Sequence, residues 1–309
     1  MTAFAARLLY LLAAALARLP WRWLVRLGDA LARWLVRRNR RESRVTRRNL
    51  ELAYPALPAP EREALHDAIL RTTARQLLET LRLWTRPHAR NLQLLRAQHG
   101  VDLFDAALAS GRGLIVAAPH YGNWELLNQW LAAKTPLAVL YAPPDSKVGE
   151  AFLNLVRAAP GADAGRVTQV RADGPAAVRH LLKLLKDGGV TGILPDQQPK
   201  RGDGEFAPFF DLPALTMTLL PRLAARTGAT VLYAYCERVG DAGDEPAFEL
   251  HIEPAAAAVS DPDPQVAAAA LNADIERIAR RDPAQYQWTY KRFSLRPDGA
   301  ANPYWPDCY

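Results

Sequence analysis

Residues 113–127, "GLIVAAPHYGNWELL", place His120 and Glu125 five residues apart, directly after an apolar run. A histidine held by a carboxylate can act as a general base, because the acid fixes the tautomer of the ring and stabilises the imidazolium that forms. Residues five apart on an ideal α-helix are separated by about 140° and lie on different faces. The two side chains can therefore meet only if His120 precedes the helix that carries Glu125.

The residues around His120 favour such a boundary between a strand and a helix. Pro119 disfavours helical geometry in the residue before it, Gly122 supplies a flexible turn, and Asn123 can cap a following helix. We therefore predict a strand over 113–119 and a helix that begins at Asn123. Junctions of this kind are where open α/β sheets bind ligands.

Several chemical roles remain open for the two residues. No serine or cysteine occurs between positions 111 and 145, so a hydroxyl activated by His120 would belong to a substrate. A hydrogen-bonded packing pair is the non-catalytic alternative. A metal site would need a third ligand, and none stands at a convincing spacing. The only cysteines, Cys236 and Cys308, indicate neither a zinc site nor a disulfide framework, so we expect a reducing compartment, no metal and no cofactor.

The rest of the chain alternates between short apolar runs and helical patterns. This alternation predicts an α/β fold, with a mainly parallel or mixed central sheet and flanking helices. The expected strands are 113–119, 137–143, 190–196, 230–239 and 247–254, and the expected helices are 59–83, 123–133, 148–159, 175–189 and 215–228.

The N-terminal region differs in composition from the remainder. Its uninterrupted apolar run, Leu8 to Ala17, is about half the roughly 20 residues that a transmembrane helix needs. Tryptophans and arginines at helical spacing predict a membrane-associated helix over 3–36 that lies in the headgroup region. A short span and an amphipathic helix packed on the domain are the alternatives. We divide the chain into an anchor with a basic segment, 1–45, and a catalytic domain, 46–309.

Positive charge is concentrated next to that helix. The chain of 309 residues has a formal net charge of +7, and seven arginines lie within 37–49. Such a run is often only a solvated face, but beside an apolar helix it favours attraction to anionic lipid. No nucleic-acid module is recognisable, so we expect a membrane partner and no nucleic acid.

Five blocks of the sequence together carry a family resemblance. "HYGNWE" resembles the H-x4-D/E signature of the lysophospholipid acyltransferase superfamily, and the longer pattern is similar to its lipid A biosynthesis late acyltransferases, the lauroyl and myristoyl transferases. The blocks occur in the family's order across nearly the whole chain: "RRNLELAYP" (47–55), "GRGLIVAAPHYGNWELL" (111–127), "GILPDQQP" (192–199), "FAPFFDLPALT" (206–216) and "YQWTYKRF" (286–293).

The resemblance implies an acyl carrier protein as acyl donor and a lipid A precursor, a phosphorylated glycolipid, as acceptor. His120 would remove the proton of the acceptor hydroxyl, and Glu125 would orient His120. Arg157 falls where the family has a functional arginine and would hold a phosphate of the acceptor, unless it is a surface arginine. Asp196 matches another family position and would shape the site, unless it is a structural turn residue.

The resemblance also implies a location, and it leaves the acceptor open. We expect the bacterial inner membrane, with the catalytic face toward the cytoplasm. Many relatives have an arginine in "YRP" where this chain has Ala142 in "YAPP". Another glycolipid, such as a phosphatidylinositol mannoside, is therefore an alternative acceptor. A non-catalytic lipid-binding protein of the same fold and a hydrolase that activates water are the remaining alternatives.

Overall fold

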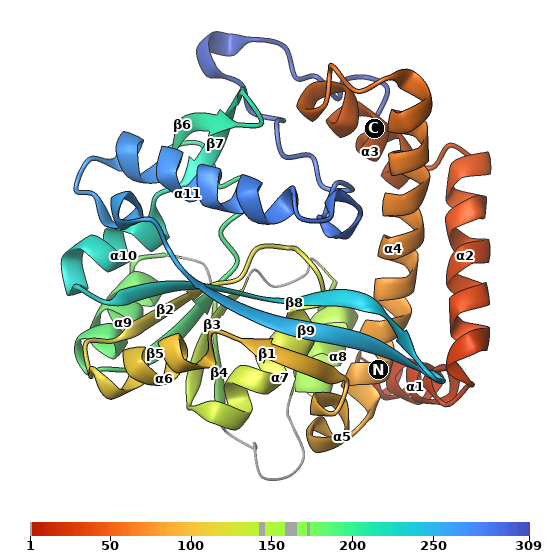
Figure 1. Cartoon of the computed structure of the whole chain (residues 1–309), viewed down its shortest axis with the longest axis horizontal. Coiled ribbons are helices and arrows are strands. Elements are labelled where there is room, and N and C mark those ends of the chain that lie inside the picture. The colour runs from red at the N-terminus through yellow and green to blue at the C-terminus, as the bar shows by residue number, and fades with distance from the viewer. Residues whose placement is uncertain (1, 142–145, 158–165, 172–173) are drawn as a thin grey trace.

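The computed structural model describes residues 2–141, 146–157, 166–171 and 174–309, and it shows the expected α/β architecture (Figure 1). A seven-stranded sheet has helices on both faces, and a two-stranded hairpin lies beside it. The helices are α1 (Thr2–Ala17), α2 (Trp21–Arg37), α3 (Arg41–Ala53), α4 (Ala59–Thr85), α5 (His88–Leu92), α6 (Val101–Ala109), α7 (Trp124–Lys134), α8 (Lys147–Arg157), α9 (Pro175–Lys186), α10 (Leu219–Thr227) and α11 (Pro264–Ala279). The strands are β1 (Leu95–His99), β2 (Leu114–Ala117), β3 (Leu137–Tyr141), β4 (Val167–Arg171), β5 (Val190–Ile193), β6 (Gly204–Phe209), β7 (Leu212–Met217), β8 (Thr230–Ala242) and β9 (Glu245–Pro254).

The central sheet is mostly parallel. Its strand order is β1-β9-β8-β2-β5-β3-β4. Strands β8, β2, β5, β3 and β4 run in one direction, whereas β9 and its partner β1 run in the other. The chain therefore places β2 beside β5, although β3 and β4 lie between them in sequence.

Strand β2 is buried on both faces, as expected for a parallel strand between helical layers. Leu114 and Val116 pack into the core under α6 and α7, and Ile115 and Ala117 pack into the core under α9, α10 and α11. Figure 1 shows α6 and α7 on one side of the sheet and α10 and α11 on the other. Helices on both faces leave the strand ends as the place where polar side chains can gather.

Two helices replace the single N-terminal helix that we predicted. The break falls before Pro20, and the axes of α1 and α2 meet at 112°. A proline has no N–H to donate and restricts the residue before it, so the apolar pattern alone overestimated the helix length. Among the described residues, no single helix is long and apolar enough to cross a bilayer, although the bent pair passes the same test of length and composition.

One face of α2 packs against α4. Trp21, Leu24, Gly28 and Ala32 follow each other at three- and four-residue spacing and are buried. The Arg75 side chain of α4 donates two hydrogen bonds to Asp29, at 2.8 and 2.9 Å. This face of α2 therefore packs on the domain, which is one of the alternatives that the sequence left open for this region (Figure 1).

Two further segments differ from the sequence pattern. The basic segment after α2 folds into α3, which buries Val45, Asn49 and Leu50. The predicted helix over 215–228 begins only at Leu219, because the residues before it form β7 in the hairpin with β6. Thr216 is fully buried there and donates to the carbonyl side-chain oxygen of Asn272 on α11, at 3.1 Å. Contacts with a distant helix thus outweigh the local helical pattern.

The turn after His120 requires glycine. Gly122 has a φ of +62°, and a Cβ atom there would lie 2.0 Å from the carbonyl oxygen of Cys236. Gly111 has a similar φ of +66°, but no atom lies within 4 Å of the position of its Cβ. The two glycines therefore share the same backbone strain and differ in the space around them.

We predict that Gly122→Ala lowers the free energy of unfolding by about 1–3 kcal/mol more than Gly111→Ala. Both variants carry the cost of a left-handed residue, about 1–2 kcal/mol, whereas only Gly122→Ala adds a backbone clash, worth about 1–3 kcal/mol. Chemical denaturation followed by circular dichroism measures both. Equal losses would show that the turn can move away from β8.

Candidate active site

His120 and Asp196 follow two neighbouring parallel strands by the same number of residues. In the register of β2 with β5, Ala117 pairs with Ile193, and the Ala118 N–H donates to the Ile193 carbonyl oxygen at 2.9 Å. His120 and Asp196 each lie three residues beyond this pair. The carboxyl ends of both strands meet at the same edge of the sheet, so the two side chains come together there. His120 precedes α7, as predicted.

Asp196 holds His120 through both its backbone and its ring. The His120 N–H donates to Asp196 Oδ2 at 2.8 Å, and Nδ1 of the ring lies 2.7 Å from Asp196 Oδ1. Because an ionised carboxylate can only accept, Nδ1 is the donor, and the neutral ring then carries its lone pair on Nε2. This is the tautomer that a general base needs.

The surroundings keep the Asp196 carboxylate ionised. Its side chain is 3% exposed, and burial opposes ionisation. The charge of His120 and the hydrogen bonds from its ring and backbone outweigh burial, so the pKa of Asp196 lies below its usual value. Tyr286 lies next to the same carboxylate. The pKa of its phenol is raised, mainly by burial and next by the charge of Asp196. The result is a fixed negative charge behind the imidazole.

The other ring nitrogen of His120, Nε2, lies next to the side-chain amide of Gln197. The amide Nε2 of Gln197 lies 3.2 Å from His120 Nε2 and also donates to the side chain of Gln287, at 3.3 Å. The His120 side chain is 12% exposed. A hydroxyl group that displaced the Gln197 amide would meet the lone pair of His120.

Segments that are distant in sequence hold the loop that carries His120. The Gln287 N–H donates to the His120 carbonyl oxygen at 3.0 Å, and Tyr121 forms a β-bridge with Tyr286. From α4, the side-chain amide of Gln76 donates to the Gly122 carbonyl oxygen. The loop is therefore fixed on two sides, which limits the motion of the ring.

The beginning of α7 confirms the predicted cap. The Asn123 side chain accepts from the Leu126 N–H at 3.2 Å. Its amide also points to Glu79, whose Oε2 is 3.4 Å away, and Glu79 accepts from Arg238 at 2.7 Å. A buried ion pair between α4 and β8 thus supports the residue that starts the helix.

Glu125 does not take the orienting position that we expected for it. Among the described residues, the ring nitrogens of His120 hydrogen-bond to Asp196 and Gln197, and Glu125 is not one of their partners. Glu125 is buried in the first turn of α7 and lines a pocket with Trp84 and Val156. Glu125 thus lines a pocket together with residues of α4 and α8, whereas Asp196 follows the end of β5 and contacts the His120 ring. A role for Glu125 in the chemistry stays a prediction.

The remaining predicted site residues are placed only in part. Arg157 is the last residue of α8, and its side chain lies outside the described part of the chain. Ala142, the departure from the family pattern, also lies outside the described residues. Their expected contact with the acceptor stays a prediction.

Sequence reasoning missed Gln197, Gln287 and Tyr286 as residues of the site. All three stand in the blocks "GILPDQQP" and "YQWTYKRF", which helped to carry the family resemblance. The second block lies about 165 residues after His120, and no local spacing links the two. Agreement of whole blocks with a family pattern was the only signal that could have identified these residues.

Comparisons with known proteins identify the family to which the chain is similar. The family model described as bacterial lipid A biosynthesis acyltransferase matches residues 2–294. The lipid A biosynthesis palmitoleoyltransferase of Escherichia coli (strain K12) is 30% identical over 295 residues, 93% of this chain and 90% of that protein. The lauroyltransferase of the same organism is 24% identical over 290 residues, with the same coverage of both chains. A phosphatidylinositol mannoside acyltransferase of Mycobacterium tuberculosis (strain CDC 1551 / Oshkosh) is 29% identical over 213 residues, 67% of this chain and 65% of that protein.

We predict that Asp196→Asn lowers the free energy of unfolding by about 1.5–3 kcal/mol at pH 7, the usual value of hydrogen bonds to a charged group. The pKa of Asp196 is lowered in the folded state, so its stabilisation is fully present above the unfolded-state pKa of about 3.9. It is lost as the pH falls through the folded-state pKa. Urea denaturation between pH 3 and pH 7 should therefore show the wild type and Asp196→Asn converging in acid.

The exposed Asp211 offers a matched control, because Asp211→Asn makes the same chemical change on the surface. Its effect should be small throughout this range. A gap between the wild type and Asp196→Asn that stays constant down to pH 3 would contradict the ionised pair.

Proposed function

Because the chain belongs to the bacterial lipid A biosynthesis acyltransferase family, we propose that it transfers a fatty acyl group from acyl carrier protein to a hydroxyl of a lipid A precursor. The observation that supports this chemistry most directly is the His120–Asp196 pair, which leaves Nε2 of His120 next to the side-chain amide of Gln197. The pair supplies a base and no nucleophile of its own. The attacking oxygen therefore belongs to the acceptor.

His120 acts first as base and then as acid. Its Nε2 accepts the proton of the acceptor hydroxyl while the oxygen attacks the carbonyl carbon of the thioester. The imidazolium that forms faces the carboxylate of Asp196, which stabilises its charge at 2.7 Å. When the carbon–sulfur bond breaks, the departing thiolate takes the proton from Nε2. The products are an ester and a free carrier thiol, and the ring returns to its neutral state.

The charge of the chain supports the two substrates. A net charge of +7 favours association with an acidic carrier protein and with a phosphorylated glycolipid, because opposite charges raise the rate of encounter. The named relatives include enzymes for lipid A and one for a phosphatidylinositol mannoside. A lipid A precursor is the acceptor that we propose, and the mannoside is the alternative.

The exposed face of the N-terminal helices supports association with a membrane. The apolar side chains of α1 and α2 that face away from the domain include Leu8, Leu11, Trp23 and Trp34, which are 48, 62, 51 and 46% exposed. Exposed apolar side chains next to arginines are typical of helices that lie in the headgroup region. We place the protein at the bacterial inner membrane, with the site toward the cytoplasm, where the carrier protein is found.

We predict that His120→Ala and Asp196→Asn each reduce acyl transfer by about 100-fold or more, the usual contribution of a general base. The double variant should lose much less than the product of the two effects, because the residues act as a unit. Transfer of a radiolabelled acyl group from carrier protein to a lipid A precursor measures this.

Glu125→Gln is the informative comparison, because it neutralises a buried carboxylate that lies five residues after His120 in the sequence. We expect Glu125→Gln to retain more acyl transfer activity than Asp196→Asn. Full activity in Asp196→Asn together with inactivity in Glu125→Gln would assign the orienting role to Glu125. Release of free fatty acid without ester would indicate a hydrolase, and no reaction would favour a lipid-binding protein.

We predict that the double substitution Leu11→Glu with Trp23→Glu releases the protein from vesicles of phosphatidylglycerol. Both changes put a negative charge on the exposed apolar face of α1 and α2, which is the face that would contact the lipid. Flotation of the full chain in a density gradient measures this. Point substitutions are preferable to deletion of residues 1–36, since loss of α2 would also expose Leu70 and Ala74 of α4.

Leu103→Glu on α6 is the control, because it introduces the same charge at a leucine that is 38% exposed away from α1 and α2. That variant should float like the wild type. If the double variant floats equally well, these helices do not hold the protein on the vesicle.

Protease added to intact spheroplasts should leave the domain uncut, and digestion would overturn the cytoplasmic orientation.

A further inference from the structure

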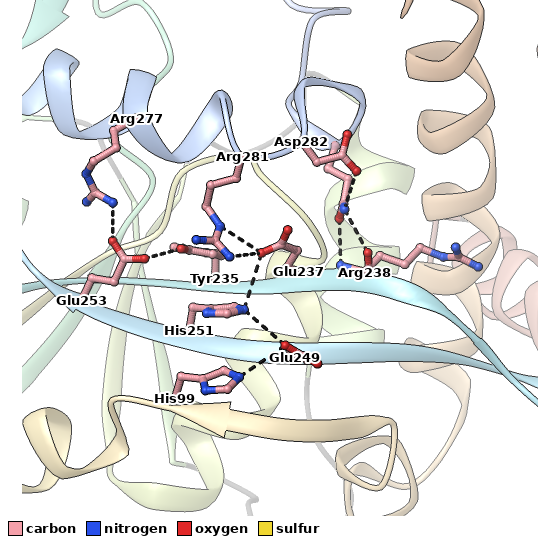
Figure 2. Close-up of polar contacts among 11 residues, drawn as sticks. His99, Tyr235, Glu237, Arg238, Glu249, His251, Glu253, Arg277, Arg281 and Asp282 are labelled. Carbon is pink, nitrogen blue, oxygen red and sulfur yellow. Dashed lines mark hydrogen bonds and ion pairs between the residues drawn. The ribbon is translucent and has the colours of Figure 1, made fainter.

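Two histidines and a glutamate gather where the edge strand β1 pairs with β9 (Figure 2). His99 ends β1 and lies directly opposite His251 in the register of the two strands. Glu249 stands two residues before His251 on β9, so it points to the same face of the sheet. Their spacing in sequence is about 150 residues, so the sequence pattern could not show this group.

The distances in this group match those between ligands of one metal ion. Glu249 Oε2 lies 3.3 Å from His99 Nε2 and 3.7 Å from His251 Nε2. One potential ligand atom from each residue can be chosen such that all three lie within 4.8 Å of one another. In a tetrahedral zinc site, bonds of about 2.0–2.2 Å place the ligand atoms about 3.3–3.6 Å apart. The His99 side chain is 53% exposed, so its ring has room to turn toward an ion.

The surroundings of His251 supply a second observation in favour of metal binding. Its Nε2 atom is buried and makes no hydrogen bond among the described residues. The nearest carboxylate oxygens, from Glu237 and Glu249, lie at 3.5 and 3.7 Å, too far for a good hydrogen bond. A buried polar atom without a partner is costly, and a metal ion would occupy the lone pair of this nitrogen.

The ring of His251 is held in place for such a role. It stacks on Tyr235 on one side, with ring centroids 5.2 Å apart, and on His99 on the other, at 4.7 Å. Glu237 is occupied elsewhere, because its Oε2 accepts two hydrogen bonds from Arg281, at 3.0 and 2.8 Å. Figure 2 shows this ion pair above the sheet and the three proposed ligands along β9 and β1.

We propose that His99, Glu249 and His251 bind a divalent transition-metal ion, best matched by Zn²⁺, and that the ion fastens β1 to β9. Two imidazoles and one carboxylate are a common ligand set for zinc and leave a fourth position for water. The side chain of His99 is 53% exposed, so the ion can enter from solvent. The site is separate from the His120–Asp196 pair, and its existence does not depend on acyl transfer.

Metal binding can be measured on the full chain, without a tag and after treatment with a chelator. Calorimetry follows the titration with Zn²⁺, and visible absorption follows the titration with Co²⁺. One ion should bind per chain, with the intense absorption of tetrahedral cobalt. His99→Ala and Glu249→Gln should each weaken binding by at least about tenfold, since even outer-shell partners of a metal site contribute about 10–100-fold. Zn²⁺ should raise the melting temperature of the wild type more than that of His99→Ala.

His180→Ala is the matched control, because His180 is an exposed histidine on α9. It should bind Zn²⁺ like the wild type. His99 is on the surface, so His99→Ala should fold, and circular dichroism checks this. The proposal is overturned if the wild type binds no ion, or if His99→Ala and Glu249→Gln bind as tightly as His180→Ala.

Discussion

One buried carboxylate, that of Asp196, organises the site. It accepts the backbone N–H of His120 at 2.8 Å and faces the ring nitrogen Nδ1 at 2.7 Å, so it fixes both the position of the residue and the tautomer of its ring. A buried charge of this kind is costly unless it is fully hydrogen-bonded. The structure meets this condition by placing the ends of β2 and β5 side by side. The chemistry of Nε2 depends on that arrangement.

The surrounding elements hold the His120–Asp196 pair in position. Gly122 lets the chain pass within contact distance of β8, and the segment that contains Tyr286 and Gln287 pairs with the His120 loop from the other end of the sequence. Residues near the C-terminus are therefore as important for the position of His120 as its own neighbours. Two of the family blocks, "GILPDQQP" and "YQWTYKRF", supply residues that contact His120 from distant parts of the chain.

Local patterns could be predicted where the forces that decide them are local. The strand before His120, the cap at Asn123 and the helix that follows depend on neighbouring residues, and the structure confirms them. The pairing of His120 with Asp196 depends on the order of strands in the sheet, which no spacing reveals. Glu125 seemed the natural partner because it is near in sequence, but the ring nitrogens of His120 contact Asp196 and Gln197. Pro20 did signal the break between α1 and α2, yet the apolar pattern obscured it.

The most direct test of this account is the proton on Nδ1 of His120, observed by NMR in protein labelled with 15N-histidine. A short hydrogen bond to a carboxylate should place this proton far downfield, and in the neutral ring Nε2 should carry no proton. The resonance should be absent from His120→Ala, lost or strongly shifted in Asp196→Asn and unchanged in Glu125→Gln. A resonance that survives in Asp196→Asn and disappears in Glu125→Gln would contradict the central role of Asp196.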